Sequence, residues 1–168
     1  MRRRNSGPFV AQRDGTYVMK LSPDVQALLV HMFGELRDVL TTGNSNEPTL
    51  QRLFPVAYHQ DPESNEEYQR LMRDDLLASR LQSLGTATSV LSRESVDDTT
   101  VLTAQELDEF ARSINNLRLV IGTVLDIDES DIDVDLDEDD PNDQRLVLYG
   151  YLGWLLDWAV TAQLDEYS

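Results

Sequence analysis

The hydrophobic positions of this chain recur at intervals of three and four residues in four separate stretches, which is the pattern of amphipathic α-helices. The first stretch covers residues 22–43, with Ser22 before Pro23 as the expected N-cap and Gly43 as the expected C-terminal cap. The other three cover residues 64–91, 103–125 and 142–164. The pattern predicts a mainly α protein, folded as a four-helix bundle.

Polar residues mark where two of these helices begin. Ser64 with Glu67, and Thr103 with Glu106, have the spacing of capping boxes, in which each side chain binds the backbone N–H of the other residue. We therefore expect the second and third helices to start at these positions. Residues 92–102 between the two helices are interpreted as a polar connector.

The fourth stretch, residues 142–164, carries apolar side chains on all sides. A helix of this kind is usually buried, so we expect it to be the most buried of the four. Gly150 and Gly153 lie three residues apart on one side of it. Their missing side chains would allow a neighbouring helix to approach closely.

The N-terminal residues 8–21 predict a short β-hairpin. Alternating residues flank Asp14-Gly15, a pair that favours a two-residue hairpin turn. An isolated hairpin is marginally stable, so this one should pack against the helices. Residues 44–62 are predicted to be mostly loop, with one turn of helix at 50–54.

Charge is distributed very unevenly along the chain. Its 168 residues include 31 acidic and 14 basic ones, for a net charge of −17. Residues 1–93 contain 11 of each sign, so residues 94–168 carry the whole surplus, with 20 acidic and 3 basic residues. Eleven carboxylates lie in residues 126–143, a predicted acidic segment between two helices. Nucleic acid is disfavoured as a partner of this half, because phosphates repel carboxylates.

We expect residues 1–7 to form a disordered basic arm and residues 8–168 to form a single helical domain. No apolar stretch approaches the length of a membrane-spanning helix, and no hydrophobic signal-peptide region follows Arg2–Arg4. The expected location is therefore the cytoplasm. The chain has no cysteine, which excludes disulfides and thiolate chemistry.

The acidic segment was compared with the EF-hand pattern for Ca²⁺. Asp126, Asp128 and Ser130 match its first three ligand positions, but Asp131 replaces the required Gly and Asp137 the final Glu. We therefore predict no dedicated metal site and no cofactor. The weak candidates for binding a divalent cation are Asp126, Asp128, Asp131 and Asp133.

The same segment is a candidate for binding a partner. Its acids alternate with aliphatic residues, so an extended conformation would place all the acids on one face. That face would suit a basic protein surface. The candidate residues are Asp131, Asp133, Asp135 and Asp137. A solvated loop anchored by its aliphatic residues is the alternative that we favour.

Enzyme templates fail on the residues themselves. His31 and His59 are the only histidines and are not in metalloprotease spacing. The chain has no nucleophile elbow, no P-loop and no dinucleotide-binding glycine pattern. We predict a protein that is not an enzyme, with His31 exposed on the polar side of the first helix.

Charged residues next to the apolar faces form a further candidate cluster. Arg118 lies at the edge of the third helix's apolar face, and a partly buried arginine needs a partner. Asp74 or Asp75 is the partner we expect, which gives a structural ion pair. An anion-binding or partner-reading cleft is the alternative. Direct DNA binding, through Arg2–Arg4 together with Arg70, Arg73 and Arg80, is a second functional class.

Several segments together carry a resemblance to a known family. They are 53–58 (LFPVAY), 68–71 (YQRL), 74–76 (DDL), 115–123 (NNLRLVIGT) and 149–155 (YGYLGWL), with the acidic segment between the last two. In this order, over about residues 9–164, the chain resembles an actinobacterial family of unknown function that includes oxidative-stress transcription regulators of the AosR type.

The resemblance implies a cytoplasmic protein that regulates transcription through a sigma factor. It also implies shared polar residues, which would here be Arg70, Asp74, Asp75, Asn116 and Arg118. Redox-regulated members sense oxidants through a cysteine pair, which this chain lacks. We expect a non-enzymatic regulatory or adaptor protein that binds a protein partner such as a sigma factor or an RNA polymerase subunit. A homodimer, formed through exposed aromatic residues of the fourth helix or of the loop at Phe54 and Tyr58, is left open.

Overall fold

The computed structural model describes residues 7–42, 53, 62–124 and 141–165. Four helices and three strands lie in these ranges, so the expected mainly α fold with an N-terminal hairpin is confirmed. In chain order they are β1 (Phe9–Ala11), β2 (Tyr17–Lys20), α1 (Pro23–Thr42), α2 (Pro62–Leu91), β3 (Thr99–Leu102), α3 (Ala104–Val124) and α4 (Pro141–Asp165).

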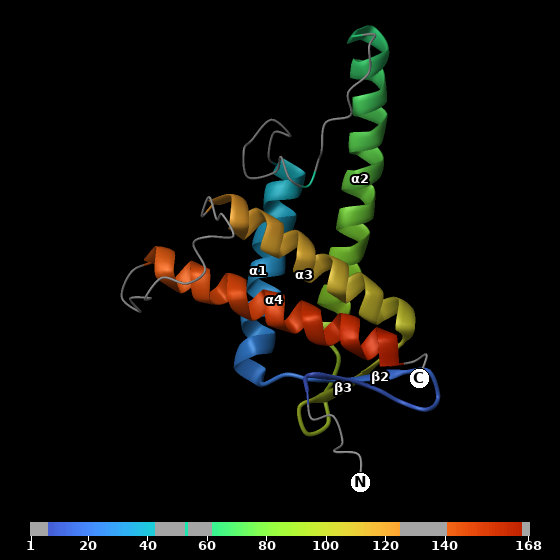
Figure 1. The fold of residues 1–168 in the computed structure, drawn as a ribbon, viewed down its shortest axis with the longest axis vertical. Coiled ribbons are helices and arrows are strands. Elements are labelled where there is room, and N and C mark those ends of the chain that lie inside the picture. The colour runs from blue at the N-terminus through green and yellow to red at the C-terminus, as the bar shows by residue number, and fades with distance from the viewer. Residues whose placement is uncertain (1–6, 43–52, 54–61, 125–140, 166–168) are drawn as a thin grey trace.

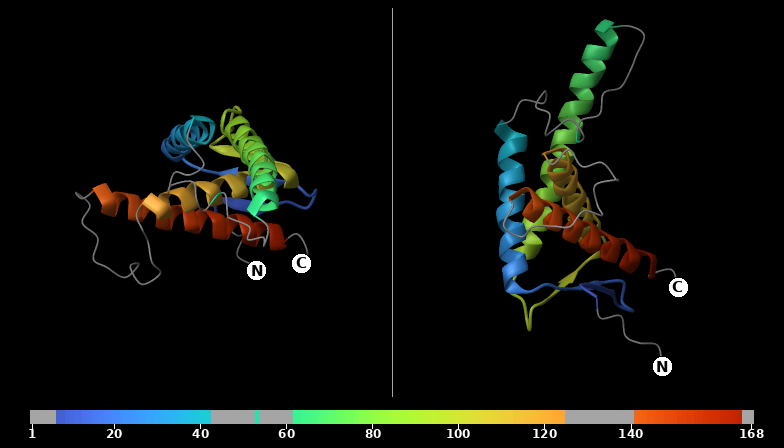
Figure 2. Two further views of the ribbon diagram at one scale, coloured as in Figure 1. Left: turned by 90° about the horizontal axis from the view of Figure 1, so that it is seen from above. Right: turned by 60° about the vertical axis from the view of Figure 1, so that its left-hand side comes forward.

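The helices form layers above a small sheet. Helices α1 and α2 pack against each other, and α3 and α4 lie side by side and cross them (Figure 1). Seen from above, α3 lies between α4 and the pair formed by α1 and α2 (Figure 2). The sheet lies at one end of the helices, where β1 contacts α4. The arrangement makes α3 the central helix.

The aromatic core joins the sheet to the helices. Phe110 of α3 is fully buried and contacts two other rings edge to face, Phe9 of β1 at 5.8 Å and Phe33 of α1 at 6.0 Å between centroids. Tyr17 and Met19 of β2 are buried in the same cluster. The hairpin is therefore stabilised by packing against helices, as expected for a sheet too small to be stable alone.

Local signals placed two of the helix starts correctly. The Val25 N–H donates to Ser22 Oγ at 3.4 Å, so Ser22 caps α1 as predicted. The Thr103–Glu106 capping box also forms. The capping box predicted at Ser64 is wrong, because α2 already begins at Pro62 and Ser64 lies inside the helix. Proline is well suited to a first helical position, where no intrahelical N–H bond is needed.

The polar connector expected at 92–102 is partly wrong, because its end forms β3. This strand pairs antiparallel with β2, giving the sheet order β1-β2-β3. A tight turn precedes it, in which Val96 and Thr99 exchange backbone hydrogen bonds and Asp97 and Asp98 both have positive φ. Asp tolerates this backbone region better than most residues. The alternating burial of Thr99–Leu102 is typical of a strand covered on one face.

The expectation that the fourth helix is the most buried is wrong. Leu152, Leu155 and Ala159 are buried, but Val147 and Trp154 are among several large apolar side chains of α4 that remain exposed. The helix packs against α3 and β1 and is the outer layer of the fold (Figure 2). Apolar side chains on all sides of a helix make burial favourable. Burial also requires other elements to cover each face, and α4 has too few of them.

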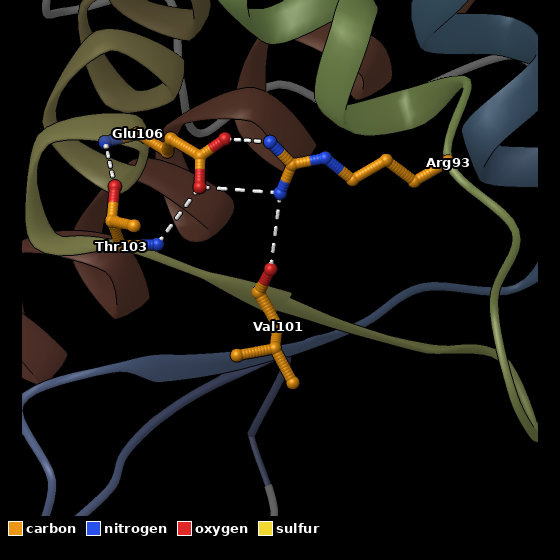
Figure 3. A network of polar contacts seen from close by, with 4 residues as sticks. All are labelled: Arg93, Val101, Thr103 and Glu106. Atoms are coloured by element: carbon orange, nitrogen blue, oxygen red, sulfur yellow. Dashed lines mark hydrogen bonds and ion pairs between the residues drawn. The ribbon is translucent and has the colours of Figure 1, made fainter.

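The C-terminal end of α2 is connected to β3 and α3 by a polar network (Figure 3). The Arg93 guanidinium forms an ion pair with Glu106 and donates to the Val101 carbonyl oxygen at 3.2 Å. Glu106 also accepts from the Thr103 N–H at 3.0 Å, and its own N–H donates to Thr103 Oγ1. The Arg93 hydrogen bond is the main reason that the pKa of Glu106 lies below its usual value, with the Thr103 contacts adding to it.

This network predicts a pH-dependent contribution to stability. Because the pKa of Glu106 is lowered in the folded state, its contribution is complete above the unfolded-state pKa and is lost as the pH falls through the folded-state pKa. Glu106→Gln should lower the free energy of unfolding by about 1–2 kcal/mol at neutral pH, discounted for the partial exposure of Arg93. Urea unfolding at several pH values should show the difference between the two proteins shrinking as the pH falls below the usual pKa range of a glutamate. A difference that stays constant as the pH falls would contradict the prediction.

Candidate functional site

A polar cluster lies between α2 and α3. Arg80 Nη1 donates to Asn116 Oδ1 at 2.8 Å, and Nη2 donates to the Leu53 carbonyl oxygen at 3.3 Å. Asn116 is only 1% exposed. Burial lowers the pKa of Arg80, and the positive charge of Arg112 lowers it further. The pKa stays far above neutral pH in any protein setting, so Arg80 is a cation held by neutral oxygens.

The position of Arg80 changes the prospects of DNA binding. Arg70 is exposed and Arg73 is partly exposed, but Arg80 turns into the helix interface. The three arginines therefore do not present a row of guanidinium groups to phosphates. The sequence carried a signal for this, because Arg80 lies three residues after Leu77 and four before Leu84, on the apolar face of α2.

The ion pair expected between Arg118 and Asp74 or Asp75 does not form. Asp74 and Asp75 are exposed on the N-terminal half of α2, which extends beyond the other helices (Figure 1). Arg118 instead stacks on the ring of Tyr149 in α4, with its guanidinium carbon 4.2 Å from the ring centroid. A cation on an aromatic face is a favourable contact that needs no carboxylate.

Gly153 lies directly against this stack, whereas Gly150 does not. A Cβ atom added at Gly153 would lie 3.1 Å from Arg118 Nε, closer than ordinary van der Waals contact, so the guanidinium would have to shift by a few tenths of an ångström. A Cβ at Gly150 would meet nothing within 4 Å. The predicted close approach therefore holds at one of the two glycines, and the group that approaches is an arginine side chain. Of the five polar candidates, Asn116 is buried and Arg118 is partly buried, while Arg70, Asp74 and Asp75 are exposed.

A groove with an aromatic wall lies where α4 passes the sheet and the start of α1. Its volume is ≈ 520 Å³. Tyr151, Trp154 and Trp158 of α4 line it together with residues from the N-terminal segment, β2, the start of α1 and the β3 turn. From here on this feature is called the aromatic groove. Lys20 and Asp98 are among the other side chains that line it.

The three rings form a continuous row. Tyr151 and Trp154 have centroids 5.6 Å apart at an interplanar angle of 30°, and Trp154 and Trp158 are 6.3 Å apart at 73°. Trp154 is 47% exposed, and burial raises the pKa of the Tyr151 hydroxyl. An exposed tryptophan inside an aromatic row is unusual for a surface and typical of binding sites.

Sequence reasoning expected this helix to be the most buried and considered exposed aromatics on it only as a dimer surface, so it missed the groove. A signal was available: residues 151, 154 and 158 share one face of α4, at spacings of three and four. Leu152, Leu155 and Ala159 form a different face with the same period, and that face is buried against the fold. When a helix has two apolar faces and one packs against the core, the other face is available for a different contact.

The acidic candidates cannot be placed. Asp126, Asp128, Asp131, Asp133, Asp135 and Asp137 all lie outside the described residues. His31 is exposed as predicted, and its Nε2 atom lies 3.2 Å from Oε1 of Glu35, one helical turn away. Within the described ranges, no group of three or more His, Cys, Asp or Glu side chains is arranged to hold a metal ion.

Comparison with known proteins gives a family but no function. Among the described parts of the chain, no helix combines the length and the apolar character needed to cross a membrane. No curated protein and no solved structure matches the sequence. The model of one protein family, described as "Domain of unknown function (DUF2017)", matches residues 3–163, which is nearly the whole chain. The chain therefore belongs to the DUF2017 family.

Proposed function

We propose that this chain is a non-enzymatic regulatory or adaptor protein that binds another protein through the aromatic groove. The observation that carries the proposal is the exposure of Trp154 within the row of three rings. Tryptophan and tyrosine dominate the energetics of protein interfaces, because they bury a large area with few rotatable bonds. A groove in which aromatic rings adjoin a few polar groups is a common form of binding site.

A second groove offers less to a partner. It lies between α2 and the start of α3, has a volume of ≈ 480 Å³, and is lined by polar side chains such as Gln82, Thr86 and Gln105. Its two glutamates already have partners: Glu106 forms an ion pair with Arg93, and Glu109 accepts a hydrogen bond from the Ser83 hydroxyl. Side chains that water solvates well gain little from burial. The aromatic groove is therefore the better candidate.

The identity of the partner is proposed from the sequence resemblance. That resemblance, to actinobacterial regulators of the AosR type, supports a sigma factor or an RNA polymerase subunit as the partner and the cytoplasm as the location. The net charge of −17 supports a basic partner surface. The acidic residues Asp131–Asp137 are a second proposed contact, separate from the groove.

Binding measurements with purified sigma factor and RNA polymerase from the same organism test this proposal. Trp154→Ala should weaken binding by at least about tenfold, as expected for the loss of a central aromatic contact. Val160→Ala is the matched control, because Val160 is exposed on α4 but does not line the groove. Equal losses in the two variants, or no loss in either, would contradict a role for the groove.

The acidic segment is tested separately in the same assay. A variant with Asp131, Asp133, Asp135 and Asp137 all changed to Asn should reduce both the affinity and its dependence on salt. Unchanged affinity would show that this segment is not part of the interface, and it would leave the groove proposal standing on the Trp154 result.

A further inference from the structure

We propose that the aromatic groove receives an arginine side chain, carried on an extended segment of a basic partner protein. The guanidinium would stack on Tyr151 and Trp154, and Asp98 would supply the opposite charge. This inference rests on the proposed function and specifies the chemistry of the occupant.

The rings favour a flat cation. A guanidinium stacks on aromatic faces and remains charged when it is partly desolvated, whereas an ammonium is compact and strongly hydrated. The chain already shows this contact on the same helix, where Arg118 lies 4.2 Å from the centroid of the Tyr149 ring. Tyr151 and Trp154 follow two and five residues after Tyr149 and together offer a wider aromatic surface, and Trp154 remains 47% exposed.

The groove is lined by one charged side chain of each sign, and the negative one suits the same occupant. Asp98 lines the groove at the turn before β3, where the hydrogen bonds between Val96 and Thr99 hold the backbone. Lys20, the only lysine of the chain, also lines it and can donate to backbone carbonyls of an extended segment. The net charge of −17 disfavours a second copy of this chain as the occupant and attracts a basic one.

One end of the aromatic row already holds a backbone segment. Gly7 lies so close to the Trp158 ring that an added Cβ would collide with it. The following residue, Pro8, is buried and accepts from the Lys20 N–H at 2.8 Å. The row therefore packs against main chain at Trp158, and the neighbouring surface at Trp154 remains open. A partner segment would extend the same mode of contact toward Tyr151.

Intrinsic fluorescence tests the inference directly, because Trp154 and Trp158 are the only tryptophans in the chain. The probe is the peptide acetyl-Gly-Pro-Arg-Leu-Pro-Arg-amide, titrated into the full-length protein beside versions with both arginines replaced by lysine or by glutamine. We expect the arginine peptide to produce a saturable change in tryptophan fluorescence. The lysine peptide should bind about five- to tenfold more weakly, and the glutamine peptide should not bind. Equal responses to all three would overturn the inference.

Two matched variants separate the local charge from the overall charge. Asp98→Asn removes the groove carboxylate while keeping a residue that tolerates positive φ. It should weaken the binding of the arginine peptide by about fivefold. Asp157→Asn removes an exposed charge of α4 outside the groove and should have little effect. Equal effects of the two would overturn the pairing with Asp98.

The remaining outcomes identify other occupants. A fluorescence change on protein dilution would point to a second copy, and tighter peptide binding after replacing Arg2–Arg4 with Gln would point to the chain's own arm; either would overturn the inference. The proposed function fails separately. If Trp154→Ala weakens binding of the full-length partner but Asp98→Asn does not, the groove remains the proposed binding site and the arginine occupant is wrong. If Trp154→Ala leaves partner binding unchanged, the groove itself fails.

Discussion

Phe110→Ala should lower the free energy of unfolding by about 3–5 kcal/mol, the largest loss expected from a single substitution in this chain. Its ring is fully buried and meets Phe9 and Phe33 edge to face, so truncation removes contacts with both the sheet and α1. A cavity would remain between elements that are distant in sequence. Urea or guanidinium unfolding, followed by far-ultraviolet circular dichroism, measures the loss.

The control for this prediction is an apolar truncation at the surface. Leu164 is 65% exposed in α4, so Leu164→Ala should change the free energy of unfolding by no more than about 0.5 kcal/mol. If Phe110→Ala does not fold, Phe110→Leu gives the same test with a smaller loss of about 1–2 kcal/mol. A similar stability for the Phe110 and Leu164 variants would contradict the central role of this ring.

Asn116→Leu should cost about 2–3 kcal/mol, the second largest effect. The side chain is 1% exposed and accepts a hydrogen bond from Arg80 at 2.8 Å. Leucine has a similar volume but no acceptor, so the guanidinium would lose a partner inside the interface between α2 and α3. The cost comes from desolvation of the remaining cation.

A double-mutant cycle separates this polar effect from packing. Arg80→Met removes the cation and keeps much of its apolar stem, so Arg80→Met with Asn116→Leu should be more stable than Asn116→Leu alone. Equilibrium unfolding of the four proteins gives the coupling energy. If the double variant is the least stable of the four and the losses simply add, the Arg80–Asn116 contact does not matter to folding.

Both substitutions address contacts whose partners could not be identified in advance. The period of apolar residues placed Phe110 and Leu117 on one face of α3, but it did not show that Phe110 meets Phe9 and Phe33. The expected pairing of Arg118 with Asp74 or Asp75 failed for a related reason. Charge alone indicates a carboxylate partner for Arg118, whereas the structure supplies an aromatic face from α4.

The strand β3 shows where local reasoning stopped short. Thr99–Leu102 is a run of four residues with strand-forming side chains, too short to stand out between two long helices. Its strand conformation depends on pairing with β2, about eighty residues earlier in the chain, where Tyr17 lies opposite Leu102. The pairing in turn places Asp98 in the wall of the aromatic groove.

Local sequence by itself determined that the chain is mainly α, where three of the four helices begin to within one residue, and that the hairpin turn contains Asp14-Gly15, although the turn spans residues 13–15 and not the two predicted. Helical periodicity, capping and turn preferences act over a few residues, so they can be read without knowing the neighbours. Tertiary structure alone decided that α3 is central and α4 peripheral, that Arg80 binds Asn116, and that three aromatic rings face a groove. Those outcomes depend on which faces find partners, and burial is a competition among all the apolar surfaces of the chain for a limited interior.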